Sequence, residues 1–150
     1  MKKVFAVLIV LLTALIFQAF AADNLIVPSQ RVGWFTIGMN MFDVSKALGR
    51  AGGVSNLGGG IMQVSYLAKY GIILNVQGDN VVSINTSNAA YYTKEGIKVG
   101  SSEESVMKAF GRNFKINQDR PEAYQINYLK KGIAFLIKNK KVIMISVYKS

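Results

Sequence analysis

The chain repeats one pattern of apolar, glycine and polar positions. A short segment with apolar residues four positions apart ends at a glycine, and three stretches of alternating apolar and polar residues follow. These positions recur at a spacing of 62 residues, which becomes 61 from Gly132 onward. The matched pairs include Gly38 and Gly100, Val44 and Val106, Gly49 and Gly111, Val64 and Ile126, Leu74 and Phe135, and Ile84 and Ile145. This agreement predicts an internal duplication.

Each copy of the pattern predicts one short helix. In the first copy, Asn40 is a suitable N-cap for a helix over residues 41–48, and the glycine after it is a suitable left-handed stop. In the second copy, Ser101 and Glu104 resemble a capping box at the start of a helix that ends at Gly111. Apolar residues four apart share one helix face, so each helix needs a sheet to cover that face.

Alternation predicts three strands in each copy, and one face of these strands is apolar or aromatic. In the first copy its residues are Met62, Val64, Tyr66, Ile72, Leu74, Val76, Val82 and Ile84, and in the second Tyr124, Ile126, Tyr128, Ile133, Phe135, Ile137, Ile143 and Ile145. Gly78 and Asp79 predict the turn before the last strand of the first copy, and residues 138–141 predict its equivalent in the second.

The predicted fold class is therefore α+β, with two tandem repeats that each pack one helix on a three-stranded antiparallel meander. Repeat one is predicted to span residues 22–86, and repeat two residues 87–150. Residues 49–60 are rich in glycine but lack the Gly-Lys-Ser/Thr ending of a phosphate-binding loop. We expect this segment to be a mobile connector between the helix and the strands.

The second face of the strands differs between the repeats. In repeat one it is mostly small and polar, as expected for a sheet that faces water on one side. In repeat two its centre is apolar, with Leu136, Met144 and Tyr148 inside a polar rim of Lys138, Gln125 and Asn127. One interpretation is a protein-binding surface, because a rigid sheet with apolar residues inside a polar rim has the layout of an interface. The other is that the two repeats pack together and bury these residues.

Three further aromatic residues are candidates for binding. Trp34 precedes the first helix, and no apolar residue corresponds to it in the second copy. Tyr91 and Tyr92 lie in the segment between the repeats. Each of the three either contributes to an interface or covers the core, and the sequence leaves both roles open.

Composition excludes several kinds of chemistry. The chain has no His and no Cys, which removes imidazole bases, thiolate nucleophiles, disulfides and the usual zinc, haem and iron–sulfur ligands. Only 8 acidic residues are present, and none of them forms a recognisable catalytic pair. We therefore expect a protein that is not an enzyme and that needs no cofactor.

Positive charge is concentrated in the second half of the chain. Residues 87–150 contain 12 basic and 5 acidic residues, a net charge of +7, whereas residues 22–86 have a net charge of +1. This half is suited to an anionic envelope polymer, lipid head groups or an acidic protein. Alternatively, the lysines are a solvated rim that prevents strands from pairing between molecules. Nucleic acid is not an expected partner, because no recognition-helix or ribonucleoprotein motif is present.

The first 21 residues have the three parts of a secretory signal. Lys2 and Lys3 are followed by an apolar run over residues 4–17, and Ala19 and Ala21 form a small-x-small cleavage site. We expect residues 1–21 to be removed and the protein to be exported, soluble, and either periplasmic or secreted.

The repeated pattern of Ile-Gly, Val, Ala-Leu-Gly, Tyr and Gly-Ile resembles a known group of proteins. Over residues 33–147 it is similar to the tandem helix-plus-meander modules of the beta-lactamase inhibitory proteins, and each repeat resembles the small outer-membrane-assembly lipoproteins of the SmpA/OmlA type. This resemblance implies a non-catalytic envelope or secreted factor that binds a protein.

Overall fold

A computed structural model describes residues 23–150, apart from the side chains at positions 119 and 120. The predicted signal segment, residues 1–21, lies outside the described residues. In chain order the elements are β1 (Leu25–Val27), β2 (Arg31–Val32), β3 (Phe35–Thr36), α2 (Met41–Leu48), β4 (Gly53–Gly58), β5 (Ile61–Tyr66), α3 (Leu67–Tyr70), β6 (Ile72–Gln77), β7 (Asn80–Thr86), β8 (Tyr92–Thr93), α4 (Glu103–Phe110), β9 (Lys115–Arg120), β10 (Ala123–Tyr128), η1 (Leu129–Lys131), β11 (Ile133–Lys138) and β12 (Lys141–Tyr148). Over the range 23–150, no helix has the length and apolar character needed to cross a bilayer.

Eight strands form one continuous antiparallel sheet in the order β4-β5-β6-β7-β12-β11-β10-β9. The predicted α+β fold of two separate helix-on-meander repeats is therefore wrong, because the chain is mostly β-sheet and the two halves share one sheet. They are joined where β7 pairs with β12, from Thr86 opposite Ile145 to Ser83 opposite Tyr148. This pairing satisfies backbone groups that would otherwise be exposed on two strand edges.

The prediction of a mobile connector after the first helix is also wrong. Residues 53–58 form β4, which pairs with β5 from Gly53 opposite Ser65 onward. Residues 115–120 form β9 and pair with β10 in the same way. Both strands are held by backbone hydrogen bonds, which do not require alternating side chains. Each half therefore contributes four strands to the large sheet, whereas three were predicted.

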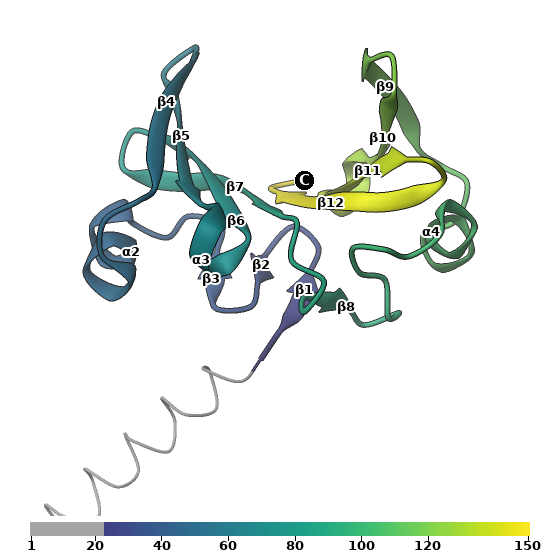
Figure 1. Cartoon of the computed structure of the whole chain (residues 1–150), viewed down its shortest axis with the longest axis horizontal. Helices are drawn as coiled ribbons and strands as arrows, with labels where there is room; N and C mark the ends of the chain where they lie inside the picture. Colours follow the sequence, from purple (N-terminus) through teal and green to yellow (C-terminus); the bar gives the residue numbers. More distant parts are fainter. Residues whose placement is uncertain (1–22) are drawn as a thin grey trace, which may run out of the picture.

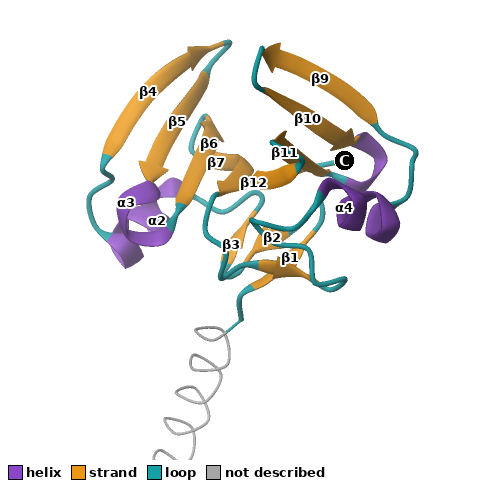
Figure 2. Cartoon of the chain, turned by 45° about the vertical axis from the view of Figure 1, so that its right-hand side comes forward, coloured by secondary structure: helices purple, strands orange, loops and turns teal. Residues whose placement is uncertain are grey.

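The large sheet is bent, with the β4–β5 and β9–β10 pairs rising on the same side of the central strands (Figure 1). Helices α2 and α4 and a small second sheet lie on the outer side of the bend (Figure 2). Leu74 and Phe135 are both 0% exposed and belong to the core between the sheet and these elements. The predicted burial of these two equivalent residues is confirmed.

Both helices end as predicted, but only one begins as predicted. The Asn40 side chain accepts a hydrogen bond from the backbone N–H of Phe42 and caps α2. The cap of α4 is Ser102, which accepts from the backbone N–H of Ser105, so the capping box expected at Ser101 is wrong. Ser101 instead accepts from the N–H of Lys98, in the turn before the helix.

In each half, a β-bulge between the last two strands changes which residue faces the core. The registers between β6 and β7 and between β11 and β12 shift at these bulges. Val81 and Val142 are therefore buried, 2% and 1% exposed, whereas Val82 is only half-buried and Ile143 is exposed. The prediction that Val82 and Ile143 face the core is wrong, because an extra residue in one strand exchanges the faces beyond it.

Tyr66 and Tyr128 attach the helix ends to the sheet. Tyr66 donates from its hydroxyl to the carbonyl of Gly49, at 3.2 Å, and Tyr128 donates to the carbonyl of Gly111, at 2.7 Å. The two tyrosines and the two glycines each lie 62 residues apart. The internal duplication itself stays a prediction.

The small sheet has the order β3-β2-β1-β8 and was not anticipated. It joins the segment before the first helix to the segment between the two halves, since β1 and β8 pair in parallel. Ile26, Val32, Phe35 and Ile97 are each at most 4% exposed and extend the core beneath the central strands. These residues close the outer side of the sheet between the two helices.

Candidate binding surfaces

The inner face of the large sheet carries the residues predicted as a protein-binding surface. Leu136 on β11 lies opposite Gln125 on β10 and opposite Met144 on β12. We define the Leu136 patch as Gln125, Asn127, Leu136, Lys138, Met144 and Tyr148. The structure therefore brings all six sequence-predicted residues of repeat two to three neighbouring strands.

Hydrogen bonds and one salt bridge hold Asn127, Tyr148 and Lys138 of the Leu136 patch. The Tyr148 hydroxyl donates to the side-chain oxygen of Asn127, across β11. Burial raises the pKa of the Tyr148 hydroxyl above its ordinary value. At the edge of the patch, Lys138 donates to Glu122 at 2.8 Å, and this bond lowers the pKa of the Glu122 carboxyl. The patch is therefore ordered before any partner binds.

The six patch residues are half-buried in the free chain. The halves of the protein meet edge to edge at β7 and β12, not face to face. In the described residues, the repeats therefore do not pack together over Leu136 and Met144, as the alternative interpretation expected. Both side chains keep part of their surface accessible for a partner.

The rest of the inner face is largely polar and mostly neutral. One row of paired residues crosses all eight strands; from β4 to β9 it contains Gly53, Ser65, Ile73, Asn85, Ser146, Ala134, Asn127 and Lys115. In the next row Asn75 donates to Ser83 at 2.8 Å, and Gln63 donates to Asn75 at 3.5 Å. Amides and hydroxyls of this kind both donate and accept hydrogen bonds, as backbone peptide groups do.

The three aromatic candidates lie away from the Leu136 patch, near the small sheet. Tyr91 is 8% exposed and packs against Gly33, where an added Cβ would come within 2.8 Å of the Tyr91 ring. It is a core residue, so it is withdrawn as a candidate for binding. Trp34 is half-buried and stacks on Phe35 with ring centroids 4.5 Å apart, whereas Tyr92 is 45% exposed. The structure does not join Trp34 or Tyr92 to the patch.

A hollow of about 420 Å³ lies where β9 begins and β10 ends. We call it the lysine hollow; it is lined by Phe110, Asn113, Phe114, Lys115, Asn127, Tyr128, Leu129, Lys130 and Lys131. Lys130 and Lys131 belong to the positively charged second half of the chain, for which the sequence predicted no hollow. Phe114 precedes Lys115, and alternation assigned it to no strand. This unassigned aromatic residue was the signal in the sequence that could have pointed to the hollow.

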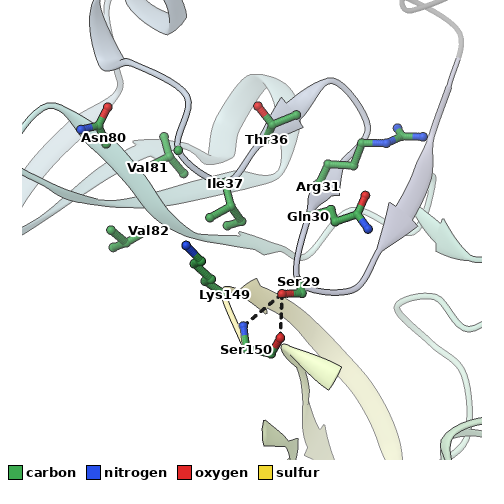
Figure 3. A pocket seen from close by; sticks show the side chains of 11 residues that line it. Ser29, Gln30, Arg31, Thr36, Ile37, Asn80, Val81, Val82, Lys149 and Ser150 are labelled. Atoms are coloured by element: carbon green, nitrogen blue, oxygen red, sulfur yellow. Dashed lines mark hydrogen bonds between the residues drawn. The ribbon is translucent and has the colours of Figure 1, made fainter. Parts of the chain in front are cut away.

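A second hollow, of about 740 Å³, lies between β2, β3, β7 and the end of the described chain (Figure 3). Its Arg31 donates to Asp23 at 2.6 Å and to the carbonyl of Gly33 at 2.8 Å. Hydrogen bonds from the Leu25 backbone and from Arg31 lower the pKa of Asp23. Ser29 accepts from the Ser150 backbone at 3.0 Å at one edge of the hollow (Figure 3). Because Arg31 already has two partners, we assign no ligand to this hollow.

Comparisons with known proteins relate the chain to others only by fold. No family model matches the chain, and no curated protein matches it. An uncharacterized protein, yfeY, from Escherichia coli shares the fold with a TM-score of 0.58 at 20% identity, covering 82% of this chain and 99% of that protein.

Two longer proteins share the fold as well. A cysteine-rich secretory protein from Staphylococcus aureus subsp. aureus Mu50 matches with a TM-score of 0.56 at 14% identity, covering 82% of this chain and 48% of its own length. An extracellular protein containing an SCP domain, from Bacillus anthracis str. Ames, matches with a TM-score of 0.53 at 10% identity, covering 76% of this chain and 44% of its own length. The chain thus spans less than half the length of these two proteins. None of the three structures is a beta-lactamase inhibitory protein or an SmpA/OmlA-type lipoprotein, so that resemblance stays a prediction.

Proposed function

We propose that the protein is an exported, non-catalytic binding module that docks another exported protein on the inner face of its large sheet. The predicted signal segment supports export, and two proteins of the same fold are described as extracellular or secretory. Periplasmic and fully secreted locations both fit the proposal. The absence of His and Cys from the sequence is in keeping with binding rather than catalysis.

The observation that carries the proposal is the placement of the Leu136 patch. Apolar Leu136 and Met144 lie next to each other on paired strands, inside a polar rim of two amides and one lysine. Side chains on a rigid sheet lose little freedom when a partner covers them, so burying them is favourable. Apolar residues of this kind inside a polar rim are the usual centre of a protein interface.

The partner we propose is a neutral, extended polypeptide segment. Asn75, Asn85, Asn127 and Gln125 present amides across the inner face, and amides pair well with backbone peptide groups. The charged groups of the Leu136 patch lie at its edge, where Lys138 already binds Glu122. Binding through this face should therefore change little between low and moderate salt.

Replacing Leu136 and Met144 together by Ser is expected to weaken partner binding at least tenfold. The loss follows because two apolar contacts at the centre of the interface become polar. A photo-crosslinking residue at position 136 should first identify the exported partner in the producing cell, with position 143 as the control site. Binding of the purified partner is then measured for the wild type, the double variant and a Leu67→Ser/Ile143→Ser control, whose two residues are 45% and 37% exposed.

A second variant separates loss of binding from loss of folding. Gln125→Lys adds a charge to the rim of the Leu136 patch without removing a core contact, and it should also weaken binding. Unchanged affinity in both patch variants, or an equal loss in the control, would contradict the proposal. Circular dichroism melting curves show whether each variant is folded.

A further inference from the structure

We propose that the lysine hollow is a binding site for a phosphate monoester or diester. This site adjoins the Leu136 patch and shares Asn127 with it, but the proposal does not depend on the protein-docking function above. The ligand's phosphate would lie among three lysines, and its organic part would lie against aromatic rings. Four features of the described residues support this assignment.

The first feature is unbalanced positive charge. Lys115, Lys130 and Lys131 line the hollow, and among its lining residues, all of which the structure describes, none is acidic. The described carboxylates form salt bridges at two places, from Asp23 to Arg31 and from Glu122 to Lys138. Three like charges around one hollow repel each other, and a bound anion removes that repulsion.

The second feature is the kind of cation. The lining contains lysines and no arginine. Lysine binds an anion as a point charge and is a common phosphate ligand, without the two parallel hydrogen bonds by which arginine recognises carboxylates and phosphates alike. Asn113 and Asn127 add neutral amides to the same lining, and an amide N–H₂ donates to phosphate oxygens.

The third feature is the aromatic floor. Phe110 and Phe114 lie against Tyr128, with ring centroids 5.5 Å and 5.7 Å from it. The Tyr128 hydroxyl already donates to Gly111, so it offers the ligand no proton and the floor is apolar. A hollow of about 420 Å³ exceeds the size of a single inorganic ion and leaves space for a glycerol or sugar unit beside Phe114, which is half-buried, whereas Phe110 and Tyr128 are 9% and 2% exposed and support it from the core.

The fourth feature is the rigidity of the lysine-bearing turn. Lys130 and Lys131 lie in η1, which ends at Gly132 in the left-handed conformation. The Gly132 carbonyl accepts hydrogen bonds from the backbone N–H groups of Ser29 and Tyr148, each at 3.1 Å. The backbone that carries the two lysines is therefore ordered in the free protein, which reduces the entropy cost of binding.

Titrations with glycerol 3-phosphate and with phosphatidylglycerol vesicles test the site at low ionic strength. Amide chemical shifts follow the soluble ester, and co-sedimentation follows the vesicles, with phosphatidylcholine vesicles as the neutral control. Binding of glycerol 3-phosphate identifies a soluble ester as a sufficient ligand. Binding of phosphatidylglycerol vesicles alone identifies the lipid head group as the source of the phosphate.

A triple variant, Lys115→Gln/Lys130→Gln/Lys131→Gln, should weaken binding of whichever probe binds by tenfold or more. The matched control is Lys46→Gln/Lys94→Gln/Lys98→Gln, which removes the same charge from exposed positions that do not line the hollow. The control should bind within about twofold of the wild type. An equal loss in both triple variants would show diffuse attraction by net charge and would overturn the site. Failure of both probes to bind the wild type would overturn it as well.

Discussion

Replacing Phe135 by Ala is expected to lower the free energy of unfolding by roughly 3–5 kcal/mol, the usual cost of emptying a large buried aromatic site. Phe135 is 0% exposed at the centre of β11. Its ring lies 5.1 Å from Phe110 on α4 and 6.1 Å from Tyr128 on β10. The cavity would therefore weaken the attachment of the helix to the sheet, because these rings form much of the contact.

The neighbouring residue provides the control for this prediction. Leu136→Ala removes an apolar side chain from the same strand but from its half-buried inner face. We expect its cost to be about 1 kcal/mol, since fewer contacts are lost there. Urea denaturation of both variants measures the difference. Equal losses would contradict the assignment of the two faces of β11.

The second large effect is expected at Gly132, where an alanine should cost roughly 2–4 kcal/mol, through left-handed backbone strain together with a steric clash. Gly132 has a φ of 64°. An added Cβ would overlap the carbonyl oxygen of Tyr148 and come within 2.8 Å of the Ser29 side chain. The change would therefore push β12 and the β1–β2 turn away from η1.

Gly78→Ala is the matched control for Gly132→Ala. Gly78 has a similar φ of 59°, but nothing lies within 4 Å of the position that a Cβ would take. Its expected cost is about 1 kcal/mol, from backbone strain alone. Thermal and urea unfolding of the two variants separate strain from steric contact. If both variants lose the same stability, the close approach at Gly132 has no energetic importance.

Local signals were sufficient for the parts of the fold that local chemistry decides. Asn40 and Gly49 bound the first helix correctly, because a cap and a left-handed stop act within a few residues of the chain. Alternation located β5, β6, β10 and β11, since a strand between core and solvent must alternate. It also placed Leu136 and Met144 on the inner face and Phe135 in the core.

The candidate sites were only partly predictable, because local signals do not show which distant segments come together. All six members of the Leu136 patch follow from period-two alternation on β10, β11 and β12. The lysine hollow combines the end of α4, the start of β9 and η1, which are far apart in the pattern. Tyr91 was ambiguous until the structure placed it against Gly33 in the core.

The sequence by itself determined the start of α2, the C-terminal ends of α2 and α4, the turns before β7 and β12, and the alternating strands β5, β6, β10 and β11. The tertiary structure alone decided that β4 and β9 are strands, that β7 pairs with β12, and that β1 pairs with β8. The reason is that backbone N–H and C=O groups are the same in every residue, so pairing between distant segments leaves no pattern in the side chains. The bulges beside Val81 and Val142 belong to this second group, because they adjust one strand to the register of its neighbour.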